Sequence, residues 1–114
     1  MTAIYKVCEQ SLWRAAEACG QFRGSADDAR DGFIHFSTAP QLAGTMAKHF
    51  AGQSGLVLIA VDPDGLGAAL KWEPSRGGDL FPHLYGPLPL SAVRWVRAVA
   101  DEVAGRRPLP ELAP

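Results

Sequence analysis

The chain has 114 residues, of which 47% are hydrophobic and 20% are charged, and its formal net charge is -1. This length and composition are typical of one globular domain that builds its core without metals or disulfides. Acidic and basic residues nearly balance, and the basic residues form no stripe along the sequence. We therefore do not expect nucleic acid as a partner.

The sequence also gives an expectation for the cellular compartment. The longest apolar run, residues 56–61, is far shorter than a membrane span. The N-terminus lacks the charged and apolar regions of a secretion signal. Cys8 and Cys19 lie in apolar company without CxxC spacing, as is typical of reduced thiols. We therefore expect a cytoplasmic protein that has no membrane segment.

The first third of the chain predicts a strand followed by two helices. Residues 3–8 are rich in β-forming side chains and predict a strand. Residues 9–19 carry apolar side chains at helical spacing and predict a helix. Ser25 is a candidate cap for a short helix that Gly32 ends.

A second strand and helix are predicted next. Residues 33–37 predict a short strand. Thr38 and Gln41 match a capping box, with Pro40 in the first turn, where its missing N–H costs little. The helix that follows has an apolar face that repeats every four residues, at Leu42, Met46 and Phe50.

The second half predicts mainly strands. Residues 56–61 are apolar on both faces and predict a central, covered strand, and residues 69–73 predict another. Residues 92–99 fit a strand, with a helix as the alternative. We expect one α+β domain over residues 1–100 and a proline-rich, extended tail over residues 101–114.

Residues 71–87 combine acidic, basic and aromatic side chains around a Gly-Gly bend bounded by prolines, as expected for the wall of a small-molecule site. Glu73 follows Trp72 at a strand end, where a carboxylate beside an aromatic wall suits general-base catalysis. Arg76 lies in the bend, where it can bind a phosphate or carboxylate. The alternative for Arg76 is an exposed turn residue that pairs with Asp79 or Glu73.

Two further groups of polar residues are candidates for the site. His83 and Tyr85 alternate along the chain, so they share a face and can hydrogen-bond a sugar or polarise a carbonyl group. His35 precedes a predicted helix N-terminus at Ser37 and Thr38, where free N–H groups and hydroxyls suit an anionic ligand. The alternative for His35 is a half-buried structural histidine, and for His83 and Tyr85 it is packing.

The three histidines, His35, His49 and His83, do not lie at metal-ligand spacing, so we expect no metal site. The sequence also lacks a P-loop, a dinucleotide glycine fingerprint and a nucleophile elbow.

The motifs at residues 31–38, 70–73 and 75–88 resemble the small bacterial family called domain of unknown function 952, and the resemblance extends from Tyr5 to about Val99. The family has no established activity. Membership implies the fold of ADP-ribosyltransferases and RNA 2′-phosphotransferases. That fold is a single compact α+β domain with two to three helices, in which a curved, split, mostly antiparallel sheet grips a dinucleotide.

In that wider group, a strand carries a His or Arg near a Ser or Thr that touches the ribose, and the segment from His35 to Thr38 is similar to it. An aromatic pair and then a Glu follow in the group. Here Glu73 precedes Tyr85, and no second tyrosine comes after Tyr85, so the set of catalytic residues does not carry over whole.

Three functions remain open. The first is an enzyme that acts on NAD, or on an ADP-ribosylated or phosphorylated ribose, with NAD as a substrate and no certain cofactor. Its catalytic residues would be Glu73 and His83, and its ligand-binding residues would be His35, Ser37, Thr38, Trp72, Arg76 and Tyr85. The second is a non-catalytic module that binds a nucleotide or another anionic metabolite. The third is a protein-interaction domain whose hot spot includes Trp72, Phe81 and Tyr85.

Overall fold

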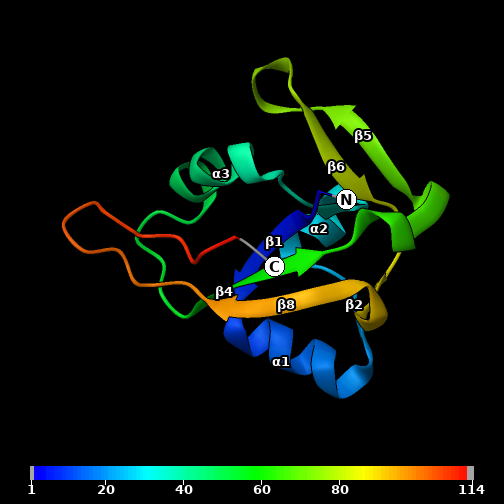
Figure 1. The fold of residues 1–114 in the computed structure, drawn as a ribbon, viewed down its shortest axis with the longest axis horizontal. Helices are drawn as coiled ribbons and strands as arrows, with labels where there is room; N and C mark the ends of the chain where they lie inside the picture. Colours follow the sequence, from blue (N-terminus) through cyan, green and yellow to red (C-terminus); the bar gives the residue numbers. More distant parts are fainter. Residues whose placement is uncertain (1, 113–114) are drawn as a thin grey trace.

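The computed structural model describes residues 2–112, apart from the side chain of Arg76. Within these residues it contains three α-helices and eight strands, and every strand pair is antiparallel (Figure 1). The α+β class, the antiparallel pairing and the single compact domain that the sequence predicts are confirmed.

The strands form two three-stranded sheets and a small ribbon. The first sheet has the order β1 (Ile4–Glu9), β4 (Leu56–Val61), β8 (Val93–Ala98). The second sheet has the order β3 (Ile34–His35), β6 (Leu80–Leu84), β5 (Leu70–Pro74). The ribbon pairs β2 (Gln21–Phe22) with β7 (Leu88–Pro89).

Strand β4 is buried along its whole length, as its apolar sequence predicts. Side chains alternate between the two faces of a strand, so Ile59 and Leu58 belong to different hydrophobic clusters. Helix α1 (Gln10–Cys19) packs on the Ile59 side, and α3 (Leu42–His49) packs on the Leu58 side (Figure 1). The first sheet is therefore covered on both faces.

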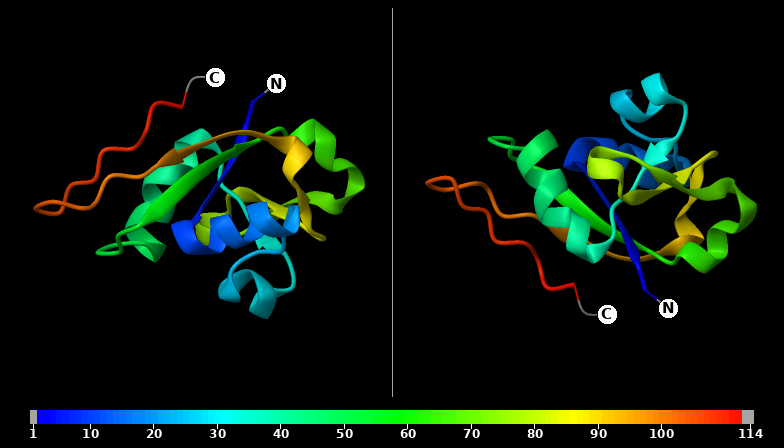
Figure 2. Two further views of the ribbon diagram at one scale, coloured as in Figure 1. Left: turned by 90° about the horizontal axis from the view of Figure 1, so that it is seen from below. Right: turned by 90° about the horizontal axis from the view of Figure 1, so that it is seen from above.

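The tail contributes to the Leu58 side of this sheet. After β8 the chain turns at a bridge between Val103 and Arg106 and then runs back (Figure 2). Leu109 and Leu112 pack against the same hydrophobic cluster as Leu58. No helix in residues 2–112 is long and apolar enough to span a membrane.

The structure resolves the alternative for residues 92–99 in favour of a strand. In β8, Val96 pairs with Ile59 and Trp95 pairs with Ala60 of the central strand. The half-buried and exposed residues of β8 alternate with a period of two. The spacing of the apolar residues in this segment also suits a helix. However, the open edge of β4 supplies backbone hydrogen-bond partners that only a strand can use.

The helices begin near the predicted positions. Ser25 caps α2 (Ala26–Asp31) in a capping box with Asp28. The helix expected directly after Thr38 begins instead with a 3₁₀ turn at Ala39–Gln41, and the α-helix starts at Leu42. The N–H of Thr38 donates to Gln41 Oε1 at 3.0 Å.

The strand expected over residues 33–37 is shorter, because its residues divide between two sheets. Ile34 and His35 pair with β6, whereas Ser37 pairs with Tyr5 of β1. The Tyr5 N–H donates to the Ser37 carbonyl at 2.8 Å, and the Ser37 N–H donates to the Tyr5 carbonyl at 2.9 Å. This segment brings the two sheets together and places His35 close to β1.

Candidate functional site

A cavity of about 280 Å³ lies where this segment meets β1, α2, α3 and the β5–β6 bend. Ionisable side chains from five elements line it, among them Lys6, Asp28, Asp31, His35, Lys48 and His83. Lys48 and His49 lie at the end of α3, whereas the carboxylates come from α2. The aspartates of the cavity therefore come from α2, together with Arg30, whereas Lys48 and His49 come from α3.

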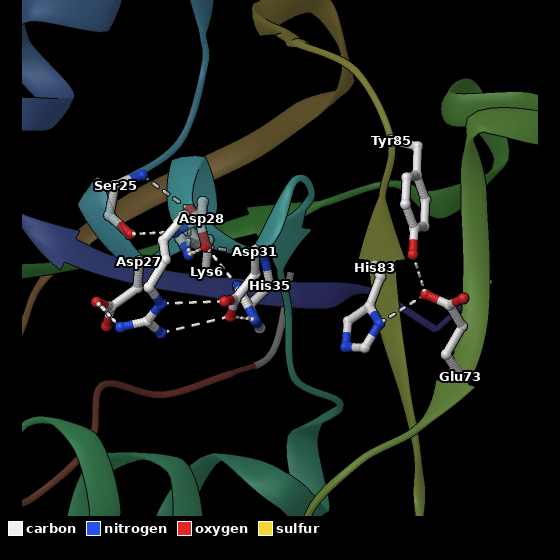
Figure 3. Close-up of polar contacts among 10 residues, drawn as sticks. Lys6, Ser25, Asp27, Asp28, Asp31, His35, Glu73, His83 and Tyr85 are labelled. Atoms are coloured by element: carbon white, nitrogen blue, oxygen red, sulfur yellow. Dashed lines mark hydrogen bonds and ion pairs between the residues drawn. The ribbon is translucent and has the colours of Figure 1, made fainter.

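The first polar group in the site, which we call the Asp28 cluster, consists of Lys6, Asp28, Asp31 and His35 (Figure 3). Lys6 Nζ lies 2.8 and 3.0 Å from the two carboxylate oxygens of Asp28. His35 Nδ1 lies 2.6 Å from Asp28 Oδ1, and the His35 backbone N–H donates to the same oxygen at 3.1 Å. A single buried carboxylate therefore holds both Lys6 and His35.

Local structure explains why Asp28 faces inward. It is the third residue of α2, and its Oδ2 accepts the Ser25 N–H at 2.8 Å in the capping box. Burial alone would raise the pKa of Asp28. The hydrogen bond from His35 and the attraction of Lys6 outweigh burial and hold this pKa well below its usual range. Asp28 is therefore ionised at neutral pH.

Asp31 closes the cluster on the solvent side. Its Oδ2 lies 3.0 Å from His35 Nε2, and its Oδ1 accepts from Arg30 Nε at 3.0 Å. The hydrogen bond from Arg30, and a smaller attraction by His35, lower the pKa of Asp31. Both ring nitrogens of His35 therefore face carboxylates.

The second polar group, which we call the Glu73 cluster, consists of Glu73, His83 and Tyr85 (Figure 3). One oxygen of Glu73 lies 2.9 Å from His83 Nδ1 and accepts the Tyr85 hydroxyl at 2.7 Å. The hydrogen bonds from Tyr85 and then His83 lower the pKa of Glu73, and the bond to Glu73 raises the pKa of Tyr85. Glu73 thus orients the buried His83 ring.

Phe33 joins the two clusters. Its ring centroid lies 4.5 Å from that of His35, 4.1 Å from that of His83 and 5.2 Å from that of Tyr85. His35 and His83 are direct partners in the β3–β6 register, and their ring centroids are 5.5 Å apart. Antiparallel pairing therefore places two imidazoles side by side at one cavity.

The structure brings several of the predicted site residues together. Glu73, His83 and Tyr85 form one cluster beside His35, and of these three residues His83 is the one that lines the cavity. Ser37 is buried at the cavity wall, where its hydroxyl hydrogen-bonds to that of Thr45 at 2.8 Å.

The other predicted site residues lie elsewhere. Thr38 is outside the cavity lining. Trp72 is 47% exposed and, by strand alternation, lies on the face of β5 opposite Glu73. The side chain of Arg76 is outside the described part of the chain.

Sequence reasoning missed Lys6, Asp28, Asp31 and Phe33 as parts of the site. The sequence did contain a signal for Lys6, since it is the one charged residue among residues 4–8 of β1. Such a residue is rarely buried without a partner. The signal for Asp28 was weaker: it is the third residue after Ser25, the predicted cap of the helix. No local pattern reveals that Lys6 and Asp28 meet, because their contact is made only through the tertiary fold.

The comparisons with known proteins identify the class to which this chain belongs. The profile of the family described as "Protein of unknown function (DUF952)" matches residues 7–96. The chain is a member of that family. No curated protein matches the chain.

Two solved structures of one bacterial relative resemble this fold. The crystal structure of protein CC0527 from Caulobacter crescentus is 48% identical, covers 94% of each chain and superposes with a TM-score of 0.89. The solution NMR structure of CC0527 is 51% identical, covers 95% of this chain and 92% of that chain, and has a TM-score of 0.82. At this identity and coverage, CC0527 shares the architecture described above.

Proposed function

We propose that the cavity binds a nucleotide or ribose-phosphate metabolite, and that the protein transfers a ribosyl or phosphoryl group of this ligand. The observation that carries the proposal is the pairing of His35 and His83 on adjacent strands at one cavity, each with a carboxylate at Nδ1. Ribosyl and phosphoryl transfer both require proton movement at hydroxyl oxygens, which oriented imidazoles perform near neutral pH.

His83 is the proposed general base. Its Nδ1 faces the ionised Glu73, so a neutral ring carries its hydrogen at Nδ1 and has a lone pair at Nε2. The Tyr85 hydroxyl donates to the same Glu73 oxygen and fixes the carboxylate in place. This is the arrangement of a base whose tautomer is set by a second residue. Glu73 and Tyr85 are then positioning residues, and His83 is the residue that contacts the ligand.

The size and charge of the cavity agree with a nucleotide fragment. Its volume of about 280 Å³ lies just below the roughly 300–1,000 Å³ of small-molecule sites, so it suits a part of a nucleotide. Lys48 and Arg30 line it and supply positive charge for a phosphate. A second cavity of about 520 Å³ shares the walls formed by Val7, Ser25 and Asp27, and it gives room for the rest of a dinucleotide.

The ADP-ribosylation-like fold is part of this proposal. Support comes from the segment of His35 to Ser37, which resembles the ribose-binding strand of that group and lies at the junction of two separate antiparallel sheets. NAD is the proposed substrate to test first, together with ADP-ribose. In this chain Glu73 precedes Tyr85, which reverses the order found in the ADP-ribosyltransferase fold group. We therefore assign the acid–base residue from its contacts in this structure and not from its position in the motifs of that group.

The test combines a thermal melt with a turnover assay. NAD, ADP-ribose and nucleoside monophosphates are added to the protein, and the melting temperature, nicotinamide release and phosphate release are measured. We expect at least one ligand to raise the melting temperature and to be turned over. His83→Gln should abolish turnover and keep the melting shift, and Lys71→Gln is the matched control on the strand paired with His83. If none of these ligands shifts the melt, the proposal is wrong.

A non-catalytic binding module is the second candidate. The observation that favours it is that carboxylates already face both ring nitrogens of His35, which suits a fixed binding group better than a proton shuttle. Ligand-induced stabilisation without product formation, unchanged in His83→Gln, would support this candidate over the enzyme.

A further inference from the structure

Both ring nitrogens of His35 face carboxylates of α2. Nδ1 lies 2.6 Å from Asp28 Oδ1, and Nε2 lies 3.0 Å from Asp31 Oδ2. An ionised carboxylate can only accept hydrogen bonds, so each contact requires a hydrogen on the facing ring nitrogen. A ring that donates to both carboxylates carries a hydrogen on each nitrogen.

Several ionisable groups surround the His35 ring. The groups around the ring are Asp28 and Asp31 of α2, Lys6 of β1, and the neighbouring His83 of β6, whose Nδ1 is held by Glu73. Arg30 lies behind Asp31 and also contacts Asp27 at 3.4 Å. Lys6 and Arg30 are the cations that pair with the three carboxylates of α2, and Lys48 of α3 also lines the cavity.

The two carboxylates that hold His35 differ in how firmly they are fixed. The Asp28 side chain is 2% exposed and also binds Lys6 and the Ser25 N–H. The Asp31 side chain is 34% exposed, and its contacts are with the side chains of Arg30 and His35. Exposed ion pairs of this kind are weak, so Asp31 is the partner that can leave.

We infer that the Asp31 carboxylate occupies the position of a ligand oxyanion, and that a phosphate or carboxylate group of the ligand replaces it between His35 Nε2–H and Arg30. The Asp31 carboxylate already bridges these two donors with its two oxygens, as an incoming oxyanion with two oxygens on one centre would. Arg30 and His35 both line the cavity. The inference rests on the proposed function, because it names the part of the ligand that His35 binds.

The first experiment needs no ligand. Nitrogen-15 NMR of the histidine side chains at pH 7, assigned with His35→Gln, reports whether each ring nitrogen carries a hydrogen. We expect both nitrogens of His35 to be protonated in the free protein. A His35 ring with one bare nitrogen at this pH would overturn the inference.

The second experiment compares two variants of one helix. Asp31→Ala removes the carboxylate that contacts His35. Asp27→Ala removes one that also lines the cavity and pairs with Arg30 but forms no ion pair with the ring. Affinities for inorganic phosphate, acetate and ADP-ribose are measured by calorimetry and by the shift of the His35 Nε2 signal. Phosphate and acetate separate the two oxyanion types.

We expect Asp31→Ala to bind at least one of these oxyanions about two- to fivefold more tightly than the parent protein. This gain corresponds to the free energy of the exposed ion pair that the ligand no longer has to break. Asp27→Ala should stay close to the parent. Equal gains in both variants would show a general charge effect and overturn the inference, as would no gain in either. Adding His35→Gln to Asp31→Ala should remove the gain, which places the anion at His35.

The outcomes keep this inference separate from the proposed function. Nucleotides that bind and turn over with no effect of Asp31→Ala would refute the inference alone. Phosphate that binds more tightly in Asp31→Ala, with no nucleotide bound by any variant, would refute the proposed function alone.

Discussion

The two histidine clusters contain the same pair of residue types but bury opposite partners. In the Asp28 cluster the carboxylate is 2% exposed and the imidazole of His35 is 36% exposed. In the Glu73 cluster the imidazole of His83 is 6% exposed and the carboxylate is 36% exposed. Asp28 is therefore a buried part of the fold, whereas Glu73 binds the buried His83 ring from the solvent side.

The difference follows from where each carboxylate lies in the chain. Asp28 belongs to a capped helix and neutralises Lys6 of β1. Glu73 lies on β5, which is an edge strand of its sheet. A half-exposed side chain on an edge strand can change with little effect on the core, so we expect Glu73 to contribute less to stability than Asp28. Variants that remove each carboxylate test this contrast directly.

Asp28→Asn should have the largest effect. It leaves the buried Lys6 ammonium without an anionic partner, and breaking a buried pair in this way costs about 3–5 kcal/mol of unfolding free energy. Urea unfolding measures the loss. The neighbouring Asp27→Asn is the control and should be nearly neutral, because its side chain is 68% exposed. Equal stability of the two variants would show that the ion pair does not support the fold.

Acid should destabilise the protein through the same carboxylate. The folded pKa of Asp28 lies below that of the unfolded chain, so the unfolded state binds a proton first as the pH falls. The stability that Asp28 contributes is complete well above its ordinary pKa of about 3.9 and declines as the pH falls below about 5. Unfolding free energies between about pH 6 and pH 2 should fall less steeply in Asp28→Asn than in the parent. Parallel pH profiles would contradict this assignment.

Phe33→Leu should have an intermediate effect and separate the two clusters. The substitution removes ring contacts to His35, His83 and Tyr85. Aromatic pairs contribute about 0.5–1.5 kcal/mol beyond the burial of area, and we expect a loss of unfolding free energy of that order. Phe33→Tyr keeps the ring and serves as the control. NMR signals of both histidines should shift in Phe33→Leu, and a change confined to one would show that Phe33 does not join them.

Glu73→Gln should have the smallest effect on stability and a clear effect on Tyr85. The bond to Glu73 raises the pKa of the Tyr85 hydroxyl, so its removal should return that pKa towards the ordinary value of about 10. An ultraviolet titration of tyrosinate follows the change, and Tyr85→Phe assigns the transition. An unchanged titration in Glu73→Gln would mean that the two groups do not interact in solution.

Much of the fold could be predicted from the sequence because local forces set it. The six apolar residues of β4 require cover on both faces of the strand. Ser25 favours a helix start because its hydroxyl accepts a backbone N–H of the first turn. The sequence likewise placed Glu73, His83 and Tyr85 within one segment, and strand alternation put His83 and Tyr85 on one face.

The tertiary structure alone decided how these parts meet. The register of β3 against β6 sets His35 opposite His83, and a shift of one residue would have turned one ring to the other face. The contact of Lys6 with Asp28 joins residues 22 positions apart, and the choice of a strand for residues 93–98 depended on the free edge of β4. Side-chain chemistry, helix caps and strand patterns are local properties, whereas register, burial and ion pairing depend on which distant segments pack together.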